Sequence, residues 1–118
     1  MNQEIKDALQ AAGVNVEGAM RRLMNNEGLF ERLLIKFKAD GNYEGMKKAL
    51  EEERYEDAFH YAHTLKGVAG NLGMDKLMDA DIVVVEKLRA GNHDGVKEDM
   101  EAVTEAYGQL MEILQKIG

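Results

Sequence analysis

The sequence predicts an all-α protein: an antiparallel four-helix bundle with additional short helices at its N-terminus. Its 118 residues include no proline, so no helix has to be broken by a missing backbone donor. Apolar residues recur three and four positions apart along most of the chain, and no segment alternates as a half-buried strand does. The connections between the long helical segments are short, which favours antiparallel neighbours.

Two short helices are expected within residues 1–26. The first covers residues 2–11 and stops near Gly13. Asn15 is expected to cap the second, because an asparagine side chain accepts a hydrogen bond from the free N–H groups at a helix start. The pair Asn25-Asn26 then breaks this helix.

Residues 27–118 are expected to form the bundle, and the whole chain, residues 1–118, a single domain. One helical face reads Leu29, Phe30, Leu33, Leu34 and Phe37. Gly41 is expected to be the C-cap of this helix. The next helix is expected from Tyr43 to Glu53. Its last turn holds three consecutive glutamates, which the helix dipole disfavours there, so this end is expected to fray or turn early.

Three longer helices complete the expected bundle. The first covers residues 55–72 with Gly73 as its C-cap, and the second covers residues 75–90. Asn92 or Asp94 is expected to cap the last helix. Its apolar positions are spaced four and three apart, as in left-handed bundle packing: Val96, Met100, Val103, Tyr107, Leu110, Leu114 and Ile117. One chain can satisfy this seam, so we expect a monomer.

The composition disfavours several classes of function. The formal net charge of −7 argues against nucleic acid and against anionic membrane as partners. With no cysteine there is no disulfide, thiolate nucleophile or cysteine-based zinc site. The N-terminus lacks the apolar run of a signal peptide and no segment reaches transmembrane length, so we expect a cytoplasmic protein. No glycine-rich phosphate loop follows a strand, so the chain is not expected to bind or hydrolyse ATP by itself.

The helix predicted at residues 55–72 combines a histidine with two glycines on one face. Gly67 and Gly70 lie one and two turns after His63. Each interior glycine costs roughly 1 kcal/mol of helix stability relative to alanine, and clearing the approach to the imidazole for another molecule is the simplest reason. Lys66 lies three residues after His63, and its side chain leans back over the ring. A cation there favours an anion on the imidazole, such as a phosphoryl group.

These residues carry a family resemblance. His63-Thr64-Leu65-Lys66-Gly67, followed by Asn71-Leu72-Gly73 and Leu77, resembles the signature of histidine phosphotransfer (HPt) domains, the helical intermediates of two-component phosphorelays. The similarity extends over nearly the whole chain. It implies that His63 is the phosphoacceptor, that Lys66 stabilises the phosphoryl group, and that Gly67 and Gly70 give the partner access. Without this context His63 reads as an ordinary core or boundary histidine.

The resemblance also implies the reaction and the partners. A ring nitrogen of His63 attacks a phosphoaspartate on a response-regulator receiver domain, and the phosphoryl group later passes to a second receiver. The expected partners are receiver domains, a hybrid sensor histidine kinase, or both. Magnesium is supplied by the acidic pocket of the receiver, so this chain needs no cofactor and acts as a phosphohistidine carrier rather than a self-sufficient enzyme. Two alternatives stay open: a domain phosphorylated directly by a kinase, as in chemotaxis kinases, and an unphosphorylated receiver-binding module.

The residue that holds the non-reacting nitrogen of His63 is left open. Members of the family often use the second residue of a Leu-Glu pair in the next helix. Here Val84-Val85 occupies that pair, and Glu86 follows one residue late. Either Glu86 takes the role after a small rotation of the helix, or Asp81 supports the site near Lys66, or both are rim charges.

The remaining candidates have two readings each. Asn71 either bonds locally near the helix end or contacts the partner. Phe59 and Val68 form either an exposed docking patch or part of the core. His60 and His63 are spaced as metal ligands could be, but such a site needs further ligands on another helix, so no metal is expected.

Overall fold

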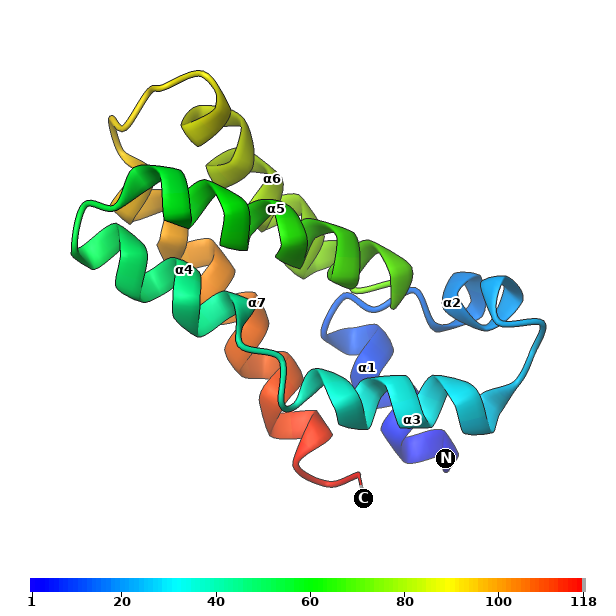
Figure 1. The fold of residues 1–118 in the computed structure, drawn as a ribbon. Helices are drawn as coiled ribbons and strands as arrows, with labels where there is room; N and C mark the ends of the chain where they lie inside the picture. The colour runs from blue at the N-terminus through cyan, green and yellow to red at the C-terminus, as the bar shows by residue number, and fades with distance from the viewer. Residues whose placement is uncertain (118) are drawn as a thin grey trace.

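The computed structural model describes residues 1–117 and confirms the all-α class. Figure 1 shows seven α-helices in this part of the chain: α1 (Gln3–Ala11), α2 (Val16–Arg22), α3 (Glu27–Phe37), α4 (Asn42–Glu51), α5 (Tyr55–Asn71), α6 (Asp75–Arg89) and α7 (Val96–Leu114). Between residues 1 and 117 the only extended pairing is a single bridge between Val14 and Met74.

The four helices α4 to α7 form the bundle. Helix α5 packs between α4 and α6, and α6 packs against α7. The helices α1, α2 and α3 gather at one end of the bundle, with α3 lying beyond the end of α4 (Figure 1). The apolar pattern groups residues 27–37 with the bundle, but in the structure these residues form α3 at its end and the bundle itself begins at α4.

The core runs through the bundle and continues into its N-terminal end. The largest fully buried side chains come from both parts: Leu9, Phe30, Leu34, Met46, Leu65, Met74, Leu77, Val84, Val85, Val96, Leu110 and Leu114. Every residue of the predicted α7 seam is buried except Tyr107, which is half-buried and stacks on Tyr43 at 4.0 Å between ring centres. Apolar burial of this extent is the main stabilising contribution to such a fold.

Three asparagines begin the N-terminal helices as the chemistry of capping predicts. The side chains of Asn2, Asn15 and Asn26 each accept a backbone N–H three residues on, at 2.8, 2.9 and 3.0 Å. The predicted Asn15 cap is confirmed. The early end of α4 is confirmed as well, because the helix stops at Glu51, and Glu53 takes a φ of +57°.

Two predicted caps are wrong. Helix α3 already ends at Phe37, and Gly41 is the N-cap residue of α4 rather than a C-cap. Neither Asn92 nor Asp94 caps α7, whose N-cap position is Gly95 with a φ of +71°. The Asn92 side chain instead accepts the N–H of Asp94 within the loop. Local side-chain bonds of this kind compete with capping.

A tight connection fixes α5 against α6. Gly73 follows the last turn of α5 with a φ of +70°, and its carbonyl oxygen accepts the Asn15 N–H at 2.7 Å. A Cβ at Gly73 would lie 2.7 Å from the Asn15 carbonyl oxygen. Both the backbone conformation and the space therefore require glycine here, and the N-terminal segment helps to hold the α5–α6 hairpin.

Candidate functional site

Helix α5 presents His63 to solvent because its other face is buried. Ala58, Ala62, Leu65 and Ala69 are all 0 % exposed. Small residues at three of these positions let the neighbouring helices approach closely. His63 lies outside this buried stripe and is exposed. Thr64 has a local role, since its hydroxyl donates to the His60 carbonyl oxygen at 3.0 Å.

Two contacts define the register between α5 and α6. The Arg89 guanidinium lies over the Phe59 ring at 5.4 Å, and a Cβ at Gly70 would lie 3.2 Å from the Sδ of Met78. Counting back one residue on α6 for each residue forward on α5, His63 faces Val85 and Gly67 faces Asp81. The position opposite the histidine is therefore apolar.

The two glycines of the His63 face have different surroundings. A Cβ at Gly67 would meet no atom within 4 Å, so this glycine leaves open space beside His63. Gly70, by contrast, makes room for the half-buried Met78 of α6. The open approach to the imidazole that the sequence suggests therefore has geometric support at Gly67, while Gly70 serves helix packing.

Neither ring nitrogen of His63 has a hydrogen-bond partner among residues 1–117. Val85, directly opposite, cannot supply one. Glu86 is exposed and its carboxylate lies 3.5 Å from the Nε of Arg89, so the structure directs it toward that arginine rather than toward His63. The register places Asp81 about one helical turn from the level of His63.

Lys66 of α5 and Asp81 of α6 carry opposite charges where these two helices pack together. Lys66 is half-buried and has no ion pair within residues 1–117. Asp81 is 0 % exposed, and neither of its carboxylate oxygens has a hydrogen-bond partner in the same part of the chain. Burial raises the pKa of Asp81 to about 7, and the positive charge of Lys66 acts in the opposite direction.

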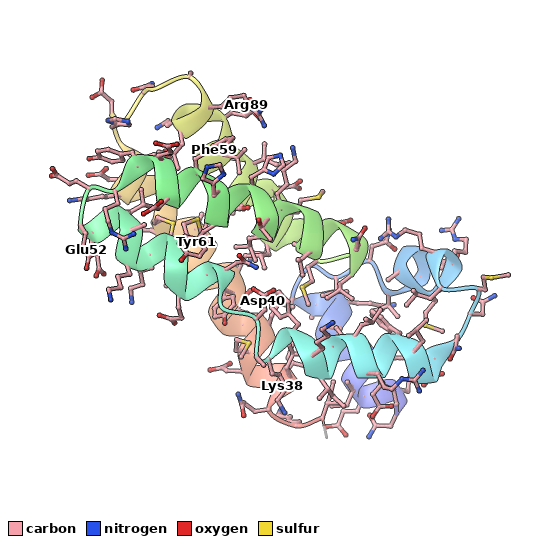
Figure 2. All side chains as sticks on the ribbon, in the orientation of Figure 1. Lys38, Asp40, Glu52, Phe59, Tyr61 and Arg89 are labelled. Atoms are coloured by element: carbon pink, nitrogen blue, oxygen red, sulfur yellow. The ribbon has the colours of Figure 1, made fainter. Side chains whose placement is uncertain are left out.

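Arg89 is a site residue that the sequence reasoning missed. Phe59 is half-buried, and its ring centre lies 5.8 Å from that of His63. Arg89, an exposed cation of α6, lies over the same ring (Figure 2), so the Phe59 ring contacts Arg89 and adjoins His63. A shallow pocket continues from this pair and is lined by Tyr55, Glu56, Phe59, Leu88, Arg89 and His93. Arg89 can be identified only from the register between α5 and α6, and the spacing of residues within one helix does not give that register.

The predicted docking residues Phe59 and Val68 do not lie on one patch. They are nine positions apart, which is two and a half helical turns, so they lie on opposite sides of α5. Val68 lines a groove against α3 together with Leu33 and Phe37, and Asn71 lines the same groove. The Asn71 side chain makes no local hydrogen bond within residues 1–117. Of the two predicted docking residues, only Phe59 therefore adjoins His63.

The other two histidines have aromatic neighbours. The exposed His60 lies edge-on to Phe59 at 5.7 Å, and His93 stacks on Tyr55 at 3.6 Å. Within residues 1–117, no three His, Asp or Glu side chains cluster as metal ligands would. Over the same residues, no helix combines the length and the apolar character needed to span a membrane.

Comparison with known proteins supports one family. The family model described as "Hpt domain" matches residues 36–113, which is more than half of the chain and covers α4, α5 and α6 and nearly all of α7. Neither the curated proteins nor the solved structures gave a significant match. Hpt domains are histidine phosphotransfer modules of two-component signalling. The match, the helical bundle and the exposed histidine of α5 agree, and the chain belongs to the Hpt domain family.

Proposed function

We propose that His63 accepts a phosphoryl group from the phosphoaspartate of one receiver domain and passes it to the aspartate of another. The observation that carries this proposal is the exposed imidazole on α5 with open space at Gly67 beside it. A receiver has to bring its aspartate within bonding distance of the ring, so this space is what the reaction needs.

The reaction is an in-line displacement at phosphorus. The lone pair of one neutral ring nitrogen forms the N–P bond, the P–O bond to the aspartate breaks, and the aspartate leaves as a carboxylate. In the reverse direction a second receiver's carboxylate forms the P–O bond and the imidazole leaves. Lys66, which forms no ion pair within residues 1–117, supplies positive charge for the phosphoryl oxygens.

Phe59 and Arg89 are proposed as the docking residues beside His63. Phe59 offers a half-buried aromatic surface, and Arg89 adds a cation suited to the acidic pocket of a receiver. The contact is expected to bury less than about 1,200 Å² in total, as transient signalling contacts do, so that the carrier can leave one partner for the next.

The test is phosphoryl transfer from a panel of chemically phosphorylated receiver domains in the presence of magnesium. We compare the wild-type chain with His63→Gln, and use His60→Gln as the matched control because His60 is exposed one turn away on the same helix. An acid-labile, base-stable label on wild type and His60→Gln, but not on His63→Gln, is the expected result.

Other outcomes would decide between the alternatives. Binding of receivers without labelling of any chain would favour an interaction module without phosphoryl chemistry. Labelling only by a histidine kinase would favour a kinase-phosphorylated domain. Labelling of His63→Gln equal to wild type would overturn the assignment of the phosphoacceptor.

A further inference from the structure

Among residues 1–117, Asp81 is the only charged residue whose side chain is completely buried. It lies on the core face of α6 in a seam with Leu77, Val84 and Leu88, spaced four, three and four residues apart. An apolar residue is the ordinary occupant of such a position, because a buried carboxylate without hydrogen bonds destabilises the folded state. An ionised Asp81 therefore needs a compensating positive charge nearby.

The positive charge of Lys66 opposes the rise that burial causes in the pKa of Asp81. The α5–α6 register places Gly67 across from Asp81, so Lys66 lies next to this level on α5. On the α7 side, Asp99 is paired with Lys87 at 2.6 Å. Lys76 of α6 donates to Gln109 of α7. Lys87 and Lys76 of α6 are thus engaged elsewhere, and Lys66 forms no ion pair within residues 1–117.

Lys66 also lies three residues after the proposed phosphoacceptor. Its positive charge therefore acts on the buried Asp81 carboxyl, and it also lies within one helical turn of the proposed site of the phosphoryl group on His63. A single ammonium group cannot contact the Asp81 carboxyl and the phosphoryl group on His63 at the same time. We propose that Asp81 is a positioning residue that shares Lys66 with the phosphoryl group on His63, so that phosphorylation draws the ammonium outward and Asp81 takes up a proton. This inference rests on the proposed function of His63.

The direction of the linkage follows from the charges. When Lys66 turns to the phosphoryl group, Asp81 keeps its burial but loses part of the opposing positive charge. Its pKa then rises above the value of about 7 in the unmodified chain. The phosphorylated form binds more protons near neutral pH, and lowering the pH through this range favours phosphohistidine over the unmodified histidine.

The first experiment uses the unmodified chain. The carboxyl carbon of Asp81 is followed by NMR across pH in wild type, in Lys66→Gln and in Lys48→Gln, an exposed lysine of α4 that serves as the control. The midpoint for Asp81 is expected to rise by about half a unit or more in Lys66→Gln alone. An equal midpoint in all three proteins would overturn the coupling, whatever His63 does.

The second experiment phosphorylates the chain with phosphoramidate, without any receiver. The P–N bond of the reagent breaks with release of ammonia as the N–P bond to His63 forms. The Asp81 midpoint is expected to rise on phosphorylation of wild type and to stay unchanged in reagent-treated His63→Gln. A phosphorylated chain with an unmoved midpoint overturns this inference alone. If the reagent labels no histidine, the proposed function of His63 fails and the inference fails with it.

Discussion

The Arg89 guanidinium lies 5.4 Å from the centre of the Phe59 ring, and the same ring lies 5.8 Å from the His63 imidazole. This arrangement joins the end of α6 to the proposed phosphoacceptor on α5. It also places two cations around the histidine, with Lys66 toward the C-terminal end of α5 and Arg89 beside the preceding turn. The two differ in what they can contact, and substitutions should separate them.

Replacing Arg89 should weaken docking without changing the chemistry of the histidine. An exposed ion pair with the acidic pocket of a receiver contributes about 0.2–1 kcal/mol. Arg89→Gln is therefore expected to slow receiver-dependent phosphorylation by up to about fivefold. Labelling by phosphoramidate should stay unchanged, since no partner docks in that reaction. Arg22→Gln, an exposed arginine of α2, is the control, and equal rates for all three proteins would exclude a role for Arg89.

Replacing Lys66 should affect the phosphoryl group itself. Hydrogen bonds to charged groups contribute about 1.5–3 kcal/mol, so Lys66→Gln is expected to lower the rate of transfer by roughly ten- to a hundredfold. The loss should appear with every receiver, because the contact is made to the group transferred. Lys48→Gln, which lies on α4, should transfer normally. A normal rate in Lys66→Gln would show that the partner supplies all the positive charge.

Alanine substitutions at Gly67 and Gly108 can separate the effect of glycine on helix stability from its effect on the access of a receiver to His63. A Cβ at Gly67 and a Cβ at Gly108 of α7 would each meet no atom within 4 Å. Alanine at either position should therefore raise the free energy of unfolding by up to about 1 kcal/mol, because alanine is the better helix former.

Only Gly67→Ala should slow phosphoryl transfer from a receiver, since its methyl group projects into the space beside His63. Gly108→Ala controls for the gain in helix stability. Transfer is measured as the initial rate from a fixed concentration of phosphorylated receiver, and unfolding by urea titration. Equal transfer rates for the two variants would show that the partner does not approach over Gly67.

The sequence could predict which residues of α5 lie near His63, but it could not predict which residues of α6 do. His63, Lys66 and Gly67 lie within one turn and a half of a single helix, so their common neighbourhood follows from helical spacing. Arg89 belongs to the site through the register between α5 and α6, which depends on packing at Gly70 and at the tight turn around Gly73. Spacing alone therefore gave Gly67 and Gly70 the same role, although Gly70 accommodates Met78.

The helix boundaries illustrate the same limit. Periodic apolar residues predicted each bundle helix, because burial of one face governs where helices form. The capping errors at Gly41 and at Asn92 arose where polar side chains bond within their own loops. The Asp40 carboxylate accepts the Asn42 N–H at 2.9 Å and the Asn92 side chain accepts the Asp94 N–H at 3.0 Å. Such local bonds are decided by backbone geometry that spacing does not specify.

The stability of the fold should depend on pH through Asp81. Its pKa is raised from 3.8 in the unfolded chain to about 7 in the folded one. The folded state therefore binds more protons between these values, and the free energy of unfolding falls as pH rises through this window. The full shift corresponds to a loss of about 4 kcal/mol above pH 7, and none of that loss is present below pH 3.8.

Asp81→Asn keeps the size of the side chain and removes the ionisation, so this part of the pH dependence should disappear. Unfolding by urea is measured at several pH values between 4 and 8 for wild type, Asp81→Asn and Asp79→Asn. Asp79 is an exposed carboxylate of the same helix and serves as the control. The difference in unfolding free energy between wild type and Asp81→Asn should grow in favour of the variant as pH rises. A difference that stays constant across this range would mean that Asp81 releases its proton at the same pH in the folded and the unfolded chain, and burial would then not raise its pKa.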